Sequence, residues 1–93
     1  MKRLLVPSPA FLRDSKRLRK KDRDASERLR AALALLAEDA FDPRLKAHKL
    51  AGELEGCWAC TVSYDLRLVF EIGKFEGQDA VMLQSVGTHD EVY

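Results

Sequence analysis

The sequence has little of what several common protein classes require. Two cysteines in 93 residues are too few for the disulfide framework that holds small secreted domains together. No apolar run approaches the roughly 18 to 20 residues of a membrane helix, and the N-terminal apolar stretch is shorter than the about 7 to 15 residues of a signal peptide. Glycine and proline are too scarce to indicate long disorder. We therefore expect a cytoplasmic protein with a single domain over residues 1–93.

Motifs for metal, redox or nucleotide chemistry are also missing. Cys57 and Cys60 have CxxC spacing, but the chain has no second pair of this kind. On a strand, residues three apart point to opposite faces, so these thiols cannot easily share a metal or a disulfide. The chain has no glycine-rich phosphate loop and no Gly-x-Ser-x-Gly elbow. We expect neither a metal nor a cofactor.

The net charge of +1 is distributed unevenly along the chain. Residues 1–50 contain fourteen basic and seven acidic residues, a net charge of +7, whereas residues 51–93 contain two basic and eight acidic residues, a net charge of −6. A basic half suggests a polyanionic partner, although a solvated helix face explains the count equally well. The candidate RNA-binding residues are Lys16, Arg17, Lys20, Lys21, Lys46 and Lys49.

Two amphipathic helices are predicted in the first half of the chain. Ser8 can cap the first helix, and Pro9 can occupy its first position, where a missing N–H costs nothing. The second helix is predicted over residues 24–38, with Asp24 and Glu27 as a capping box. An apolar stripe spaced i, i+3, i+4, i+7 predicts that this helix packs on a sheet. The stripe consists of Leu29, Ala32, Leu33 and Leu36.

Alternation of apolar and polar residues predicts strands over 58–64, 66–72 and 80–86, after a short first strand over 2–6. The polar, glycine-containing segment 73–79 is predicted to be a turn. The element order β-α-α-β-β-β predicts an α+β fold with both helices on one face of a mostly antiparallel sheet.

A pattern of short motifs extends over the second half of the chain. In sequence order it comprises His48, Leu50, Gly52, Trp58, Asp65, Arg67, Leu68, Val69, Phe70, Gly87, Thr88, His89 and Tyr93. In order and spacing this pattern resembles the RelE/ParE superfamily of toxins, and within it the YafQ-like ribonucleases. The resemblance implies a RelE-like fold, a cognate antitoxin as partner, and metal-independent cleavage of messenger RNA, at the ribosome, through attack by the ribose 2′-hydroxyl. Another branch of the superfamily inhibits DNA gyrase and is not a nuclease.

Such a cleavage needs a base for the 2′-hydroxyl, an acid for the leaving 5′-oxygen and a cation for the charge on the phosphorane. Histidine suits the first two roles because its unperturbed pKa is about 6.5. The chain has two histidines, and both match functional positions of the YafQ-like pattern: His89 as general acid or base, and His48 as a candidate second group. The alternatives are an exposed histidine near a flexible end and a solvated loop histidine, respectively.

Arg67 is the candidate phosphate clamp, because a guanidinium can hold two phosphate oxygens at once. The strand alternation directs its side chain away from the core, where an ion pair with Asp65 or Glu71 is the alternative. Asp65 could orient a histidine or contact a ribose, or it could be an ordinary turn residue. Tyr93 could stack on a base or take part in proton transfer, or it could belong to a frayed end.

Thr61 departs from the YafQ-like pattern, which often has a histidine at this position. Threonine cannot serve as a base near neutral pH. Three interpretations follow from the departure: a slower nuclease, a mechanism that pairs His48 with His89, or a protein without nuclease activity. The last would be a gyrase inhibitor or an inactive homologue that only binds its antitoxin.

Overall fold

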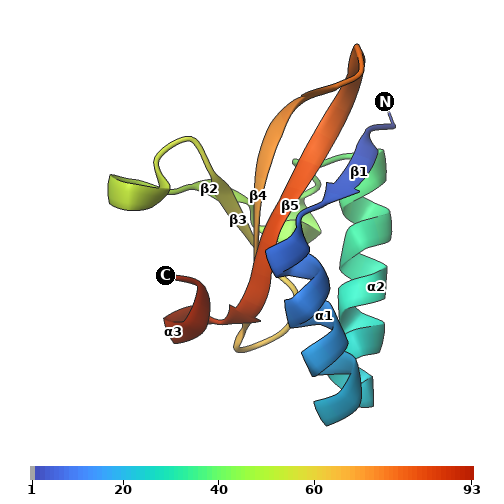
Figure 1. Ribbon diagram of the computed structural model, residues 1–93, viewed down its shortest axis with the longest axis vertical. Helices are drawn as coiled ribbons and strands as arrows, with labels where there is room; N and C mark the ends of the chain where they lie inside the picture. The colour runs from blue at the N-terminus through green and yellow to red at the C-terminus, as the bar shows by residue number, and fades with distance from the viewer. Residues whose placement is uncertain (1) are drawn as a thin grey trace.

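Two long helices pack on one face of a five-stranded sheet, and a short third helix lies on the opposite face (Figure 1). The computed structural model describes residues 2–93. The helices are α1 (Pro9–Lys21), α2 (Arg23–Glu38) and α3 (His89–Val92), with 3-10 turns at η1 (Pro43–Leu45) and η2 (Gly52–Leu54). The strands are β1 (Leu4–Pro7), β2 (His48–Lys49), β3 (Trp58–Thr61), β4 (Leu66–Phe75) and β5 (Gln78–Thr88).

The strand order across the sheet is β1-β5-β4-β3-β2. Strand β1 pairs with β5 in parallel, and the other neighbours pair antiparallel. The architecture confirms the predicted α+β class, with both long helices on one face of a mostly antiparallel sheet. No helix among the described residues is long and apolar enough to cross a membrane.

The helix boundaries follow local capping chemistry. Ser8 caps α1 by accepting a hydrogen bond from the Phe11 N–H at 3.1 Å, with a proline in the first turn as predicted. The capping box predicted at Asp24 is wrong, because α2 begins one residue earlier. Asp22 is its N-cap and accepts from the Ala25 N–H at 3.1 Å, whereas Asp24 pairs with Arg28 along the helix. A carboxylate just outside the helix reaches the free N–H groups of the first turn, which Asp24 inside that turn does not.

The hydrophobic core lies between the two long helices and the sheet. Leu29, Ala32 and Leu36 of the predicted stripe are buried in it, and Leu33 packs against it. From the sheet and the connecting segments, the core takes Leu45, Cys60, Leu68, Phe70, Val81, Leu83 and Val86.

Two strand predictions were wrong in extent. Segment 73–79 is not a polar loop, because β4 and β5 form a long hairpin that turns only at Glu76 and Gly77. Both turn residues have positive φ, 51° and 81°, a conformation in which glycine carries no Cβ penalty. The strand predicted over 58–64 ends at Thr61, and Tyr64 beyond it is 96% exposed. Neither α3 nor β2 was predicted.

Candidate functional site

Three residues in register form a row across the face of the sheet opposite α1 and α2. Thr61 on β3 lies opposite Arg67 on β4, and Arg67 lies opposite Gly87 on β5. Directly paired residues on antiparallel strands project from the same face. Leu66 and Leu68, which flank Arg67, are buried toward the helices. The row therefore faces away from the core, as the strand alternation predicts for Arg67.

Backbone carbonyls hold the Arg67 guanidinium in place. Its Nη1 donates to the carbonyl oxygens of Ser63, Tyr64 and Leu66 at 3.0, 3.2 and 3.0 Å. Glu71, one of the expected ion-pair partners, accepts instead from another side chain, an amide on β5, at 2.8 Å. Carbonyl oxygens are neutral acceptors, so these bonds fix the orientation of Arg67 without cancelling its charge.

The short helix α3 carries His89 and Tyr93 onto the same face. The His89 ring packs edge-on against the Tyr93 ring, with centroids 4.4 Å apart and planes at 82°. The Tyr93 N–H also donates to the His89 carbonyl at 3.1 Å. Burial raises the pKa of the Tyr93 phenol, and the nearby charge of Arg67 opposes part of that rise. The tyrosine is therefore part of a helical turn beside Arg67, with a phenol that stays protonated near neutral pH.

His48 lies on the same face at the far edge of the sheet. It stands on β2 rather than in a loop, opposite Ala59, which in turn lies opposite Val69. This row runs parallel to the row of Thr61, Arg67 and Gly87 and is displaced from it by two residues along each strand. Strand spacing puts the Cα atoms of His48 and Arg67 about 12 Å apart. His48 therefore lies on the β2 side of Arg67, whereas His89 directly follows β5 on its other side.

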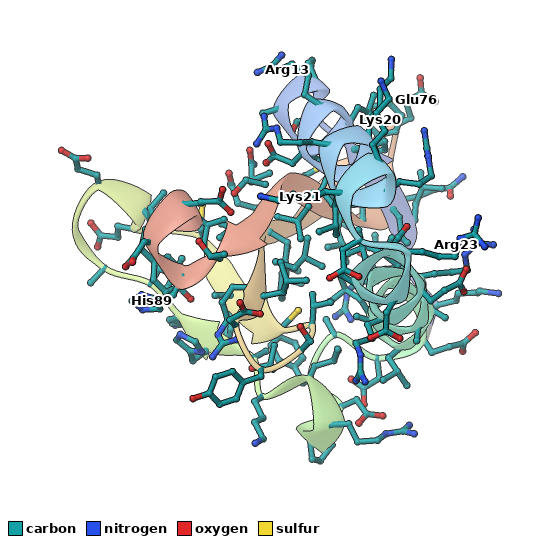
Figure 2. All side chains as sticks on the ribbon, turned by 90° about the horizontal axis from the view of Figure 1, so that it is seen from below. Arg13, Lys20, Lys21, Arg23, Glu76 and His89 are labelled. Carbon is teal, nitrogen blue, oxygen red and sulfur yellow. The ribbon has the colours of Figure 1, made fainter. Side chains whose placement is uncertain are left out.

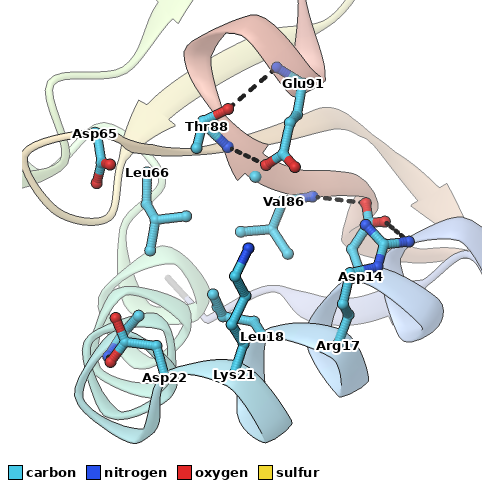
Figure 3. A pocket seen from close by; sticks show the side chains of 12 residues that line it. Asp14, Arg17, Leu18, Lys21, Asp22, Asp65, Leu66, Val86, Thr88 and Glu91 are labelled. Atoms are coloured by element: carbon cyan, nitrogen blue, oxygen red, sulfur yellow. Dashed lines mark hydrogen bonds and ion pairs between the residues drawn. The ribbon is translucent and has the colours of Figure 1, made fainter.

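Asp65 lies in the exposed turn between β3 and β4 and lines a different feature. A pocket of about 340 Å³ extends from this turn to the facing sides of α1 and α3 (Figure 3). Its charged lining is mixed, since Arg17 and Lys21 are accompanied by four carboxylates. This mixture makes the pocket a poor phosphate site, and we locate the candidate chemistry at Arg67 and α3. The position of Asp65 fits the turn interpretation.

The six candidate RNA-binding cations do not form one patch. Arg17 and Lys21 line the pocket toward α3, and Figure 2 shows Lys21 pointing away from α1. Lys16 and Lys20 are exposed elsewhere on the same helix. Lys46 and Lys49 lie next to or on β2, at the opposite edge of the sheet from β1 and β5. The sequence alone does not place these two groups relative to each other, because it does not show at which edge of the sheet β2 is added.

The two cysteines are separate free thiols. Cys60 faces the helices, and burial raises its pKa to about 12. Cys57 is half-buried, and its pKa is raised by burial and by the neighbouring Glu71 carboxylate. Within the described residues 2–93, no three His, Cys, Asp or Glu side chains are grouped as metal ligands would be.

Sequence reasoning missed the residues that hold α3. Thr88 and Glu91 form a capping box, in which each side chain accepts a hydrogen bond from the backbone N–H of the other residue. The spacing Thr-x-x-Glu is a sequence signature of this motif and could have predicted the helix. Gly87 lies close to Glu91, with little room for a side chain, and this contact depends on tertiary packing and had no local signal.

Comparisons with known proteins agree with this architecture. A family model described as "Bacterial toxin of type II toxin-antitoxin system, YafQ" matches residues 3–93. A histidine-to-glutamine mutant of YafQ from E. coli is similar at 20% identity and TM-score 0.81, covering 99% of each chain. The E. coli DinJ-YafQ toxin-antitoxin complex matches at 21% identity and TM-score 0.76, over 100% of this chain and 99% of that one.

A copper-bound mutant toxin from Helicobacter pylori has 25% identity and TM-score 0.75, with both chains covered completely. No match was found among curated protein sequences.

Proposed function

Because the chain belongs to the YafQ family of bacterial type II toxins, we propose that it is an endoribonuclease that cuts messenger RNA without a metal ion. One observation carries the proposal. The fixed, un-neutralised guanidinium of Arg67 lies on the same face as the His89–Tyr93 ring pair, and its charge acts on the Tyr93 phenol. A cation and proton-transfer groups around one phosphate are what such a cleavage needs.

In the proposed reaction, the ribose 2′-oxygen forms a bond to phosphorus as the bond to the 5′-oxygen breaks. A base takes the 2′-hydroxyl proton, and an acid protonates the 5′-oxygen, leaving a 2′,3′-cyclic phosphate. Arg67 stabilises the phosphorane through the guanidinium edge formed by Nε and Nη2, since its carbonyl bonds use Nη1. His89 transfers one of the two protons. Because its phenol is protonated, Tyr93 can act as a hydrogen-bond donor or an acid but not as a base.

His48 is the candidate for the second proton transfer, since Thr61 has no basic group. The separation of about 12 Å between the Cα atoms of His48 and Arg67 suits two long side chains that reach toward one nucleotide from opposite sides. Asp65 is not needed as a positioning group in this scheme.

The partners of this chemistry are messenger RNA, presented by the ribosome, and a cognate antitoxin. Arg17 and Lys21 lie across the pocket from α3, beside the face that carries Arg67, so they can bind phosphates next to the cut. Lys49 lies over the Trp58 ring on the other face, and it can bind ribosomal RNA instead. Such contacts predict a steep loss of binding with salt. Because the E. coli YafQ structure is a toxin-antitoxin complex, we expect this chain also to bind a protein antitoxin in the cytoplasm.

The proposal is tested by expressing the protein in bacteria and mapping RNA 5′ ends by primer extension. We expect codon-related cuts in the messages, and we expect His89→Ala and Arg67→Ala each to abolish them and to restore growth. Arg28→Ala is the matched control, since this exposed arginine lies on α2 and pairs with Asp24. Intact messages accompanied by DNA damage would instead support a gyrase inhibitor. Unchanged cutting by both site variants would exclude His89 and Arg67 from the reaction.

A further inference from the structure

The last helix is too short to be stable by its own backbone bonds. α3 comprises four residues, and helix nucleation in water is unfavourable without further interactions. The capping box supplies two of them (Figure 3). The Glu91 N–H donates to Thr88 Oγ1 at 3.3 Å, and the Thr88 N–H donates to Glu91 Oε1 at 2.8 Å.

Gly87 provides the space in which this capping box closes. A Cβ atom at Gly87 would lie 2.8 Å from Glu91 Oε1, 3.2 Å from Glu91 Cβ and 3.4 Å from Val92 Cγ1. The φ angle of Gly87 is not in the left-handed region, so the backbone itself does not require glycine at this position. The restriction is steric: a methyl group would move the Glu91 carboxylate from its place beside the Thr88 N–H, and the Cβ atom of Glu91 would have to shift by a few tenths of an ångström.

The same contact fixes the two rings of the candidate site. His89 is the first residue of α3, and Tyr93 is the residue that caps its end. Gly87 lies directly opposite Arg67 in the sheet. A rotation or lift of α3 would therefore move both rings relative to the guanidinium, while the core on the other face would be unaffected.

Glu91 also faces the helix layer across the pocket, where Arg17 and Lys21 of α1 are among the lining residues. The hydrogen bond from the Thr88 N–H lowers the pKa of the Glu91 carboxyl, and the charges of Lys21 and Arg17 lower it further. The carboxylate is bonded to the strand end, and the two cations favour its ionised form.

From this arrangement we propose that Gly87, Thr88 and Glu91 are positioning residues that set the distance of His89 and Tyr93 from Arg67. The expected effect on RNA cleavage rests on the proposed ribonuclease function. The expected effect on the positions of the two rings does not. None of the three residues transfers a proton or contacts the phosphate.

The test combines histidine-ring NMR with cleavage of RNA on translating ribosomes. The Tyr93 ring shifts the His89 ring signals through its ring current, whereas the Trp58 indole, which packs edge-on against Phe41 beside the core, is an internal control for the fold. We expect Gly87→Ala and Glu91→Ala to move the His89 signals toward those of an unstructured peptide and to leave the Trp58 indole signals in place. Glu91→Gln keeps an acceptor oxygen for the Thr88 N–H and should retain both the signals and the cleavage.

We expect Gly87→Ala to lower kcat by about 10²-fold with little change in KM, as small misplacements of catalytic groups do. The proposal is overturned if the His89 signals stay unchanged in both Gly87→Ala and Glu91→Ala, or if they move while kcat does not. If the parent protein cleaves no RNA, the ribonuclease assignment fails. The NMR signals still decide whether these residues position the two rings.

Discussion

The two faces of the sheet are built in different ways. On the face covered by α1 and α2, large apolar side chains such as Leu36 and Phe70 are fully buried, and burial of apolar area provides the stability. On the opposite face, a four-residue helix is held by a capping box and by the absence of a side chain at Gly87. Substitutions on the first face carry a cost in folding. On the second face, Thr61 and Arg67 are only partly buried, so they can be changed with less effect on the fold.

The largest effect on stability is expected from a substitution on the face covered by α1 and α2. Phe70→Ala removes a fully buried ring and should cost about 3 to 5 kcal/mol of unfolding free energy, a large part of the roughly 5 to 15 kcal/mol typical of a domain. Urea unfolding followed by circular dichroism measures this. A cost near zero would mean that the core does not provide the stability of the domain.

On the open face, Arg67→Lys should separate function from stability. Lysine keeps the charge but cannot bind two phosphate oxygens through one planar edge, so we expect cleavage to fall by about 10² to 10³-fold. Urea unfolding should change far less than for Phe70→Ala. Full cleavage by the lysine variant would mean that only the charge matters at this position.

Thr61→His is a substitution on the open face that should raise activity rather than lower it. Thr61 lies opposite Arg67, so a histidine there would project beside the guanidinium on the open face. We expect faster cleavage, within the roughly 10² to 10⁴-fold that positioned proton transfer contributes. The measurement is single-turnover cleavage by both proteins at neutral pH. A slower variant would show that Thr61 itself is needed.

The smallest effect is expected on acidification, which should weaken the attachment of α3 and leave the rest of the fold unchanged. The folded-state pKa of Glu91 lies below its ordinary value of 4.5, so its ionised form stabilises the capping box. That contribution is fully present above pH 4.5 and is lost as the pH falls through the lowered pKa. We expect the His89 ring signals to report detachment of α3 on acidification, and Glu91→Gln to remove this pH dependence. An identical acid response in the glutamine variant would assign the effect to another group.

The sequence predicted the covered face better than the open one for a physical reason. The stripe of Leu29, Ala32 and Leu36 and the alternation around Leu68 and Phe70 are periodic patterns, which repeat wherever a face is buried. The outward direction of Arg67 followed from the same alternation.

The open face depends on tertiary register, which no local pattern encodes. Strand β2 has two residues, too few for any periodicity, so His48 was expected in a loop. The alignment of Thr61, Arg67 and Gly87 requires knowing the pairing of three strands. The family resemblance supplied the candidate residues, but only the fold brings Arg67 and the His89–Tyr93 pair to one face.

The central claim is that Arg67 and His89 act on one phosphate. The most direct test is an NMR titration with a short RNA that has hydrogen in place of the 2′-hydroxyl at the scissile position and cannot be cut. If both residues hold the same phosphate, the Arg67 Nε–H and the His89 ring signals will shift together, with one dissociation constant. Shifts confined to one of the two residues, or two different dissociation constants, would contradict the claim.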